Sequence, residues 1–216
     1  MALLAKLEVV QIGPGLAAAV CTRLLADLGA HVSCINSGSS SPLAAYLNHD
    51  KFVANTAEAE RAALGSARLI VRQAPPTLAA STPYTLKALR RSNLDAVVVM
   101  ISPYGESGPQ AGDPATDLTL FYASGVARLL TGQVDDLSEP PLRPVGEQSA
   151  FIGGLAAACA GSGLDSTRCN ALHDAHAVLL DAGLRCTLDR RPRLVAPDPA
   201  LEAKRQLGNR NDMNPG

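Results

Sequence analysis

Short apolar runs rich in β-branched residues alternate with longer stretches of helical spacing over the first half of the chain. The apolar runs predict strands at residues 7–12, 31–35, 67–71 and 95–101. The stretches between them predict helices at Leu16–Leu28, Ala57–Leu64 and Pro83–Arg91. Strands that alternate with helices pair in parallel through crossover connections. The pattern therefore predicts an α/β fold, a Rossmann-like parallel sheet with helices on both faces.

The pattern becomes less regular after residue 101. Residues 102–109 are rich in turn-forming residues and predict a loop, and further helices are predicted at Leu118–Leu130, Ala150–Cys159 and His173–Leu180. Ala150–Cys159 consists mainly of small residues, so we expect this helix to pack closely on a neighbour. From Arg185 onward the chain is polar and rich in Pro and Arg. We expect one α/β domain at 1–184 and a loosely ordered tail at 185–216.

The composition fits a globular protein and excludes several partners. Of the 216 residues, 47% are hydrophobic, and 19 Lys and Arg balance 20 Asp and Glu. This balance argues against nucleic-acid and anionic membrane partners, which require clustered positive charge. The N-terminus lacks the features of a signal peptide, and no apolar run has the length of a membrane span. We expect a cytoplasmic protein whose five scattered cysteines are free thiols.

A glycine turn between the first strand and the first helix resembles a dinucleotide fingerprint. Gly13, Gly15 and Ala18 have the spacing that lets a backbone approach a pyrophosphate. The second strand ends at Asn36, however, where a ribose-binding carboxylate is required. A nicotinamide-dependent enzyme is therefore a secondary alternative, and a tight turn that packs a helix on a strand is the simpler interpretation.

The remaining local patterns predict no metal and no hydrolase site. His173 and His176 could share a helical face, but no third ligand stands at a suitable spacing, so no metal site is predicted. No serine nucleophile elbow occurs. Cys21, within an Ala- and Leu-rich helix, is expected to act as a small hydrophobic residue.

Several segments, in order, resemble the class III CoA-transferase family, which includes formyl-CoA transferase, carnitine CoA-transferase and the α-methylacyl-CoA racemases. The segments are 21–30 (CTRLLADLGA), 47–51 (LNHDK), 93–102 (NLDAVVVMIS), 104–109 (YGESGP), Asp117, 123–125 (ASG) and 130–132 (LTG). They cover roughly residues 7–160. The resemblance implies the N-terminal half of such a protein: an incomplete large domain, without the small domain and glycine loop that complete the family's fold.

The family mechanism implied by this resemblance is CoA transfer between carboxylic acids. An Asp carboxylate attacks an acyl-CoA thioester, which gives a mixed anhydride and CoA thiolate. Aligning on Gly154 places Ala150 at the nucleophile position, and aligning on Gly146 places Glu147 there. The first alignment continues into the following helix without a gap. Under it the nucleophile is replaced, whereas under the second Glu147 is the candidate catalytic residue.

The resemblance also implies a ligand and the residues near it. The substrate is CoA or acyl-CoA, with no permanently bound cofactor. Lys51 follows the LN segment, while Arg72 and Gln73 stand where the family has Asn and Phe of its NFRPG motif. These three residues are the candidate CoA-binding set, with Lys51 or Arg72 near a phosphate. The alternative for both cations is a solvated surface position.

The sequence leaves two alternatives open for the oligomeric partner and the activity of the chain. The chain could form a homodimer, as the family does, and act as a CoA-transferase-like protein. Alternatively, it could be a non-catalytic subunit or binding module that completes its fold with a second, complementary polypeptide.

Overall fold

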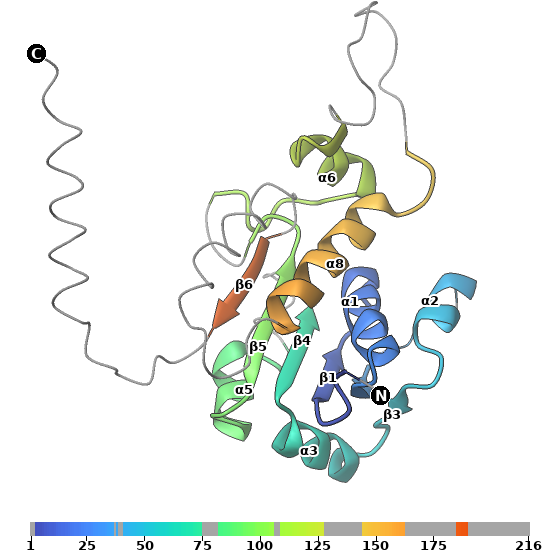
Figure 1. Ribbon diagram of the computed structural model, residues 1–216. Coiled ribbons are helices and arrows are strands. Elements are labelled where there is room, and N and C mark those ends of the chain that lie inside the picture. The colour runs from blue at the N-terminus through green and yellow to red at the C-terminus, as the bar shows by residue number, and fades with distance from the viewer. Residues whose placement is uncertain are drawn as a thin grey trace, which may run out of the picture.

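β1 lies inside a six-stranded sheet whose order is β3-β2-β1-β4-β5-β6 (Figure 1). The computed structural model describes residues 3–36, 38, 41–74, 82–105, 109–127, 144–162 and 185–189. The strands are β1 (Glu8–Ile12), β2 (His31–Ile35), β3 (Phe52–Val53), β4 (Leu69–Gln73), β5 (Val97–Ser102) and β6 (Arg185–Asp189). The helices are α1 (Leu16–Asp27), α2 (Pro42–Leu47), α3 (Ala57–Ser66), α5 (Leu86–Ser92), α6 (Asp117–Ala123) and α8 (Gln148–Ser162).

The strand pairing confirms the predicted fold class. β1 pairs in parallel with both β2 and β4, β2 with β3, and β4 with β5. β6 is antiparallel to β5 and forms one edge of the sheet. Residues 185–189, expected as the start of a loose tail, thus belong to the sheet, and residues 190–216 lie outside the described part of the chain.

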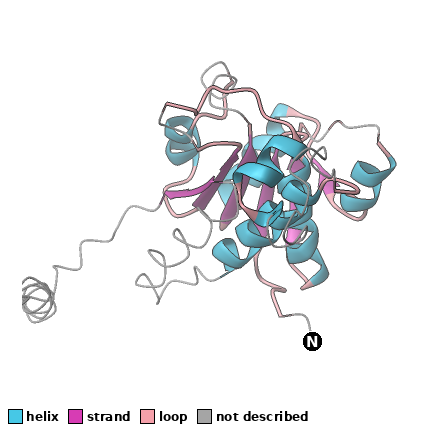
Figure 2. Ribbon diagram, turned by 90° about the horizontal axis from the view of Figure 1, so that it is seen from above, coloured by secondary structure: helices cyan, strands magenta, loops and turns pink. Residues whose placement is uncertain are grey.

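Helices cover both faces of the sheet (Figure 2). On one face, α1 and α8 pack on alternate side chains of the central strands, including Val9, Val71 and Val99. On the other face, Leu64 of α3 and Leu89 of α5 pack on the intervening side chains. This alternation follows from the period of a strand, in which successive side chains point to opposite faces. Near-continuous apolar strands are the consequence of burial on both faces.

The ends of the helices follow local signals. Side-chain oxygens of Ser41, Thr56, Thr85 and Thr116 each accept a hydrogen bond from the first turn of α2, α3, α5 and α6 respectively. α6 ends at Ala123, short of the predicted Leu130, because Gly125 follows with a φ of +77° and stops the helix. The predicted helix at 173–180 falls outside the described residues.

α8 packs closely on α1, as its small residues predict. A Cβ built on Gly154 would lie 2.6 Å from Val20 Cβ and 2.7 Å from the Ala17 carbonyl oxygen. The absence of a side chain at Gly154 therefore sets the distance between the two helices. This contact fixes the start of α8, and with it Ala150, relative to α1.

Candidate functional site

The carboxyl ends of β1 and β4 meet where the chain reverses its direction across the sheet. From β1 the chain runs to β2 and β3 on one side, then returns to β4 and β5 on the other. Ile12 at the end of β1 pairs with Arg72 in β4. Open α/β sheets bind ligands outside the carboxyl ends of their strands at such a point. The candidate site is therefore bounded by the turn after β1 and by Arg72 and Gln73.

The Gln73 side chain occupies the glycine turn. Its Oε1 accepts a hydrogen bond of 2.9 Å from the backbone N–H of Ala18, in the first turn of α1. A Cβ on Gly15 would lie 2.3 Å from Gln73 Oε1, and a Cβ on Gly13 would lie 2.9 Å from the Gln73 carbonyl oxygen. Gly13 also has a φ of +96°, which favours glycine. The two glycines thus allow β4 to approach α1, in agreement with the simpler interpretation of the motif.

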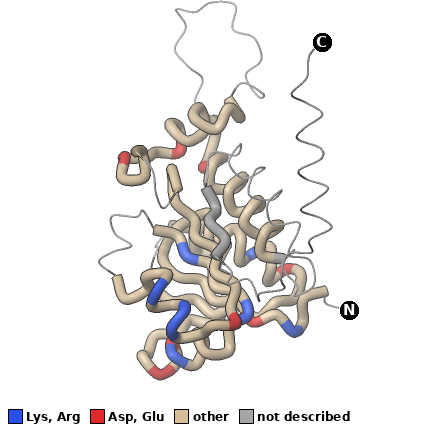
Figure 3. Tube along the Cα trace, turned by 90° about the vertical axis from the view of Figure 1, so that its left-hand side faces the viewer, with Lys and Arg blue, Asp and Glu red and all other residues tan. Residues whose placement is uncertain are grey.

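Arg72 and Lys51 are both buried. Arg72 is 2% exposed and Lys51 is 8% exposed, so the alternative of a solvated surface position is wrong for both. Other Lys and Arg positions are interspersed with Asp and Glu in the lower part of the tube (Figure 3). Burial of a cation is costly unless its donors are satisfied, which makes the surroundings of these two residues informative.

The ammonium of Lys51 lies in a network of neutral oxygens between β1 and α1. Its Nζ donates to Thr22 Oγ1 at 2.8 Å and to Gln11 Oε1 at 3.0 Å. It also lies within donating distance of the Ala19 carbonyl oxygen, at 3.0 Å, and of Asn48 Oδ1, at 3.2 Å. An ammonium has three protons. The internal acceptors are therefore sufficient to satisfy Lys51 without a ligand.

Burial dominates the electrostatics of this network. It lowers the pKa of Lys51 from its usual 10.5 to about 8, an effect that neighbouring thiols only partly oppose. Burial also raises the pKa of Cys34, whose thiol donates to Gln11 Oε1 at 3.6 Å. The network therefore holds a thiol in its neutral form beside an ammonium that lacks a carboxylate partner among its hydrogen-bond acceptors.

Glu147 and Ala150, the alternative nucleophile positions, differ in environment. Glu147 is exposed, and its carbonyl oxygen accepts a hydrogen bond of 3.1 Å from Phe151 N in the first turn of α8. Ala150 is half-buried and packs against the cluster between α1, α8 and the sheet. The methyl group of Ala150 can act neither as a nucleophile nor as a base, whereas the Glu147 carboxyl is exposed to solvent.

Asp117 and Ser149 form a polar contact next to Ala150. Asp117 Oδ1 accepts a hydrogen bond of 2.9 Å from Ser149 N and a second one from Ser149 Oγ. Thr116, the residue before Asp117, caps α6 together with Thr119. Asp117 and Thr116 therefore both stabilise the start of a helix.

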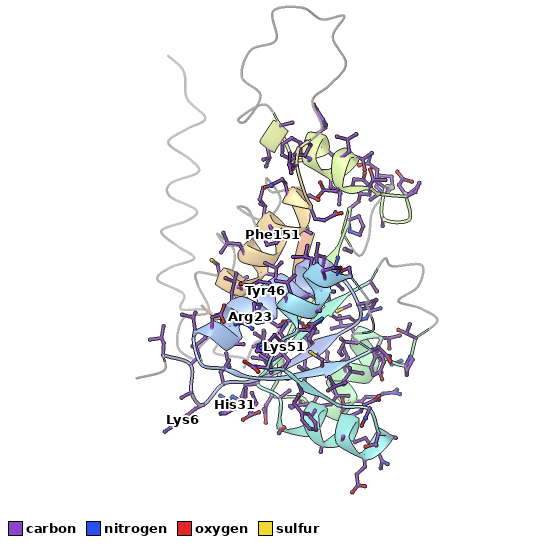
Figure 4. The ribbon with its side chains drawn as sticks, turned by 90° about the vertical axis from the view of Figure 1, so that its right-hand side faces the viewer. Lys6, Arg23, His31, Tyr46, Lys51 and Phe151 are labelled. Carbon is purple, nitrogen blue, oxygen red and sulfur yellow. The ribbon has the colours of Figure 1, made fainter. Side chains whose placement is uncertain are left out.

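The structure brings two of the four predicted site residues to α1. Of the other two, Arg72 precedes Gln73 in β4, and Glu147 lies immediately before α8. Gln73 contacts Ala18 from the β4 side, and Lys51 contacts Ala19 from the opposite side. Figure 4 shows Lys51 below Arg23 of α1, and Phe151 of α8 above both. Sequence reasoning missed Gln11 and Thr22, although a polar residue inside an apolar strand and another inside an Ala- and Leu-rich helix were visible signals.

The part of the chain that the structure describes contains no cluster of three metal-ligating residues, and His173 and His176 lie outside it. Cys21, Cys34 and Cys159 are reduced cysteines there, the first two buried. Within these same ranges no helix combines the length and apolar character needed to cross a membrane.

Two solved structures share this fold. The first, a hypothetical protein (Rv3272) from Mycobacterium tuberculosis, matches 74% of this chain with a TM-score of 0.60 and 21% identity. The second, a CAIB/BAIF family protein from Brucella suis, matches 73% of this chain with a TM-score of 0.60 and 18% identity. The chain spans about half the length of each, 49% and 47% respectively. At these identities the similarity shows the fold.

Sequence comparisons give only short matches. No family model matches the chain. A bifunctional glutamine synthetase adenylyltransferase/adenylyl-removing enzyme from Xanthomonas oryzae is 40% identical over 96 residues, which cover 44% of this chain and 9% of that enzyme. The corresponding enzyme from Stenotrophomonas maltophilia is 62% identical over 39 residues, 4% of its length. Matches to so small a part of an enzyme do not define the class of this chain.

Proposed function

We propose that this chain is a CoA-transferase-like protein of the CAIB/BAIF family, the class III CoA-transferases, and that it binds CoA or acyl-CoA. The observation that carries the proposal is the fold shared with a CAIB/BAIF protein over 73% of the chain. The ordered family landmarks, from 21–30 to 130–132, support it independently. The ligand would bind at the carboxyl ends of β1 and β4, where Arg72 and Gln73 lie.

The residues at the start of α8 determine whether the chain can attack the thioester of an acyl-CoA. The covalent route of this family needs a carboxylate that attacks the thioester carbon. With Ala150 at that position, the chain would bind the thioester without forming an anhydride. With Glu147 instead, a carboxylate one methylene longer than Asp would have to approach from an exposed turn, and a displacement of about 1 Å reduces rates severely.

Isothermal titration with CoA, acetyl-CoA and NAD tests the ligand. We expect CoA and acetyl-CoA to bind and NAD not to bind, because Asn36 replaces the ribose-binding acid and Gln73 fills the glycine turn. NAD binding without CoA binding would overturn the proposal in favour of a nicotinamide-dependent enzyme. Absence of binding by all three would favour a module that acts only with another chain.

A second candidate, a non-catalytic subunit, is favoured by one observation. Phe151 and Leu155 lie one turn apart on α8 and are 40% and 54% exposed. Such a stripe is suited to a protein partner, either a second copy or a complementary polypeptide. Light scattering of the purified chain, alone and with candidate partners, tests this. Loss of association in Leu155→Ser, but not in Leu94→Ser at an exposed position between α5 and β5, would support an interface at α8.

A further inference from the structure

The Gln73 amide lies where a nucleotide phosphate would lie in a fold of this kind. The first N–H groups of a helix have no intrahelical acceptor and carry partial positive charge, so they attract phosphate oxygens. In this chain the N–H of Ala18 already donates to Gln73 Oε1 at 2.9 Å. The donor and acceptor are 55 residues apart, so the contact is formed by the fold and not by the turn itself.

The glycines of the turn are spaced around this side chain. A Cβ on Gly15 would lie 2.3 Å from both Cδ and Oε1 of Gln73 and 2.6 Å from Cγ. The space that a fingerprint glycine opens for a pyrophosphate is therefore filled by three atoms of Gln73. α1 has 12 residues, and Gly15, the N-cap residue before Leu16, offers no side chain to cap it. Gln73 supplies the missing acceptor from the neighbouring strand.

From this geometry we infer that Gln73 is a specificity-determining residue: its amide oxygen takes the place of a phosphate oxygen at α1 and excludes nucleotide phosphates from the β1–α1 turn. Because the Gln73 side chain occupies the turn, the glycines can have the spacing of the fingerprint although the carboxylate that would bind a ribose is absent. The inference concerns the β1–α1 turn alone. CoA also carries a pyrophosphate, so under the proposed function its phosphates would lie at the sheet edge outside this turn. Exclusion by Gln73 can therefore hold or fail independently of CoA binding.

Amide NMR of the ¹⁵N-labelled chain tests the exclusion directly. The probes are inorganic pyrophosphate and adenosine diphosphate, and the signal is the amide of Ala18. We expect no saturable shift in the wild type. In Gln73→Ala we expect a saturable shift, because an intramolecular hydrogen bond no longer competes. The affinity for pyrophosphate should be at least about tenfold higher than the upper limit that the wild-type titration sets.

Two further variants keep the test decisive. Gln73→Glu retains an acceptor of the same length and should remain closed to pyrophosphate, with the wild-type fold. Gln73→Asn withdraws the acceptor by one methylene and should open the turn partly, which provides a readout even where Gln73→Ala is poorly folded. A saturable Ala18 shift in the wild type would overturn the inference, as would a folded Gln73→Ala or Gln73→Asn that gains no binding.

A double-mutant cycle tests the filled space without any ligand. In the wild type, Gly15→Ala must push the Gln73 side chain away and break its hydrogen bond to Ala18. In the Gln73→Ala background the same substitution meets no such obstacle, so we expect a much smaller loss of stability. Equal losses in both backgrounds would contradict the role of Gln73. A parallel titration with CoA reports on the proposed function, since CoA binding without an Ala18 shift would support it while leaving α1 closed.

Discussion

The carboxylate of Asp117 is hydrogen-bonded to Ser149, the residue that precedes Ala150 in the first turn of α8. Oδ1 accepts the backbone N–H of Ser149 at 2.9 Å and also its hydroxyl. The start of α8 is thereby tied to the start of α6, across 32 residues of chain. An aspartate at a family landmark thus acts here as an acceptor for the free donors of a helix N-terminus, a role that a carboxylate performs well.

Removal of this acceptor is expected to destabilise the start of α8. Asp117→Ala should lower the free energy of unfolding by about 1–2 kcal/mol, because the Ser149 donors lose their partner while Ser149 stays buried. The measurement is urea denaturation followed by circular dichroism. Asp113→Ala, at an exposed position in the preceding loop, is the control and should change stability little. Equal effects of the two substitutions would refute the capping role.

The chemistry of α8 is tested with an acyl-CoA and hydroxylamine, which traps acyl anhydrides. With Ala150 at the nucleophile position we expect no acyl-enzyme and no CoA transfer, because no carboxylate can attack the thioester. Ala150→Asp places a carboxylate there but also buries it partly against the core, so we expect little recovery and some loss of stability.

The same assay separates the two alignments. If Glu147 is the catalytic group, transfer or α-proton exchange occurs in the wild type and is abolished by Glu147→Gln. Activity that survives Glu147→Gln would exclude that role. Gln148→Ala, one residue further along, provides a control for the disturbance of the helix start.

The sheet was predictable from the sequence because its cause is local. Val97–Ser102 is an apolar β-branched run, and burial on both faces of a parallel sheet requires such a run. The place of the Gln73 side chain was not predictable in this way. Its contact with Ala18 spans 55 residues, and the same glycine spacing would serve equally well for a phosphate. The sequence therefore located the correct turn but did not show what fills it.

The burial of Lys51 was also not predictable from the sequence. The LN segment marked this residue as a candidate, but a lysine in a polar run is ordinarily exposed. Its burial depends on Gln11 and Thr22, which are 40 and 29 residues away. Only the folded arrangement of β1 and α1 brings their oxygens to the ammonium. The role of Lys51 in CoA binding remains a prediction.

The close contact between α1 and α8 gives a packing prediction. Gly154→Ala should destabilise the fold by about 1–3 kcal/mol, because the added methyl would lie 2.7 Å from the Ala17 carbonyl oxygen and the helices would have to separate. Gly65→Ala, within α3 and facing open space, is the matched control. It should be neutral or stabilising by about 0.5–1 kcal/mol, since Ala favours a helix over Gly. Thermal unfolding of both variants, compared with the wild type, distinguishes packing from helix propensity.

The buried ammonium of Lys51 predicts how stability depends on pH. Its pKa is about 8 in the folded chain and 10.5 when unperturbed. Between these values the unfolded chain holds a proton that the folded chain has released, so the free energy of unfolding should rise with pH across this window through Lys51. Cys34 acts in the opposite direction above pH 9.0, because its raised pKa keeps a proton on the folded chain that the unfolded chain loses.

The contribution of Lys51 is isolated by comparing variants at each pH. We expect the stability difference between wild type and Lys51→Met to shift in favour of the wild type as the pH rises from 8 to 10.5, and to be independent of pH between 6 and 8, where the lysine is protonated in both states. The comparison removes only the part of the Cys34 contribution that is independent of Lys51, whose charge lowers the pKa of that thiol. Lys87→Met, at an exposed lysine of α5, is the matched control for the substitution itself. A pH-independent difference for Lys51→Met over the whole range would mean that the folded ammonium titrates as it does in water, and that the network of Gln11, Thr22 and Ala19 does not hold it away from solvent.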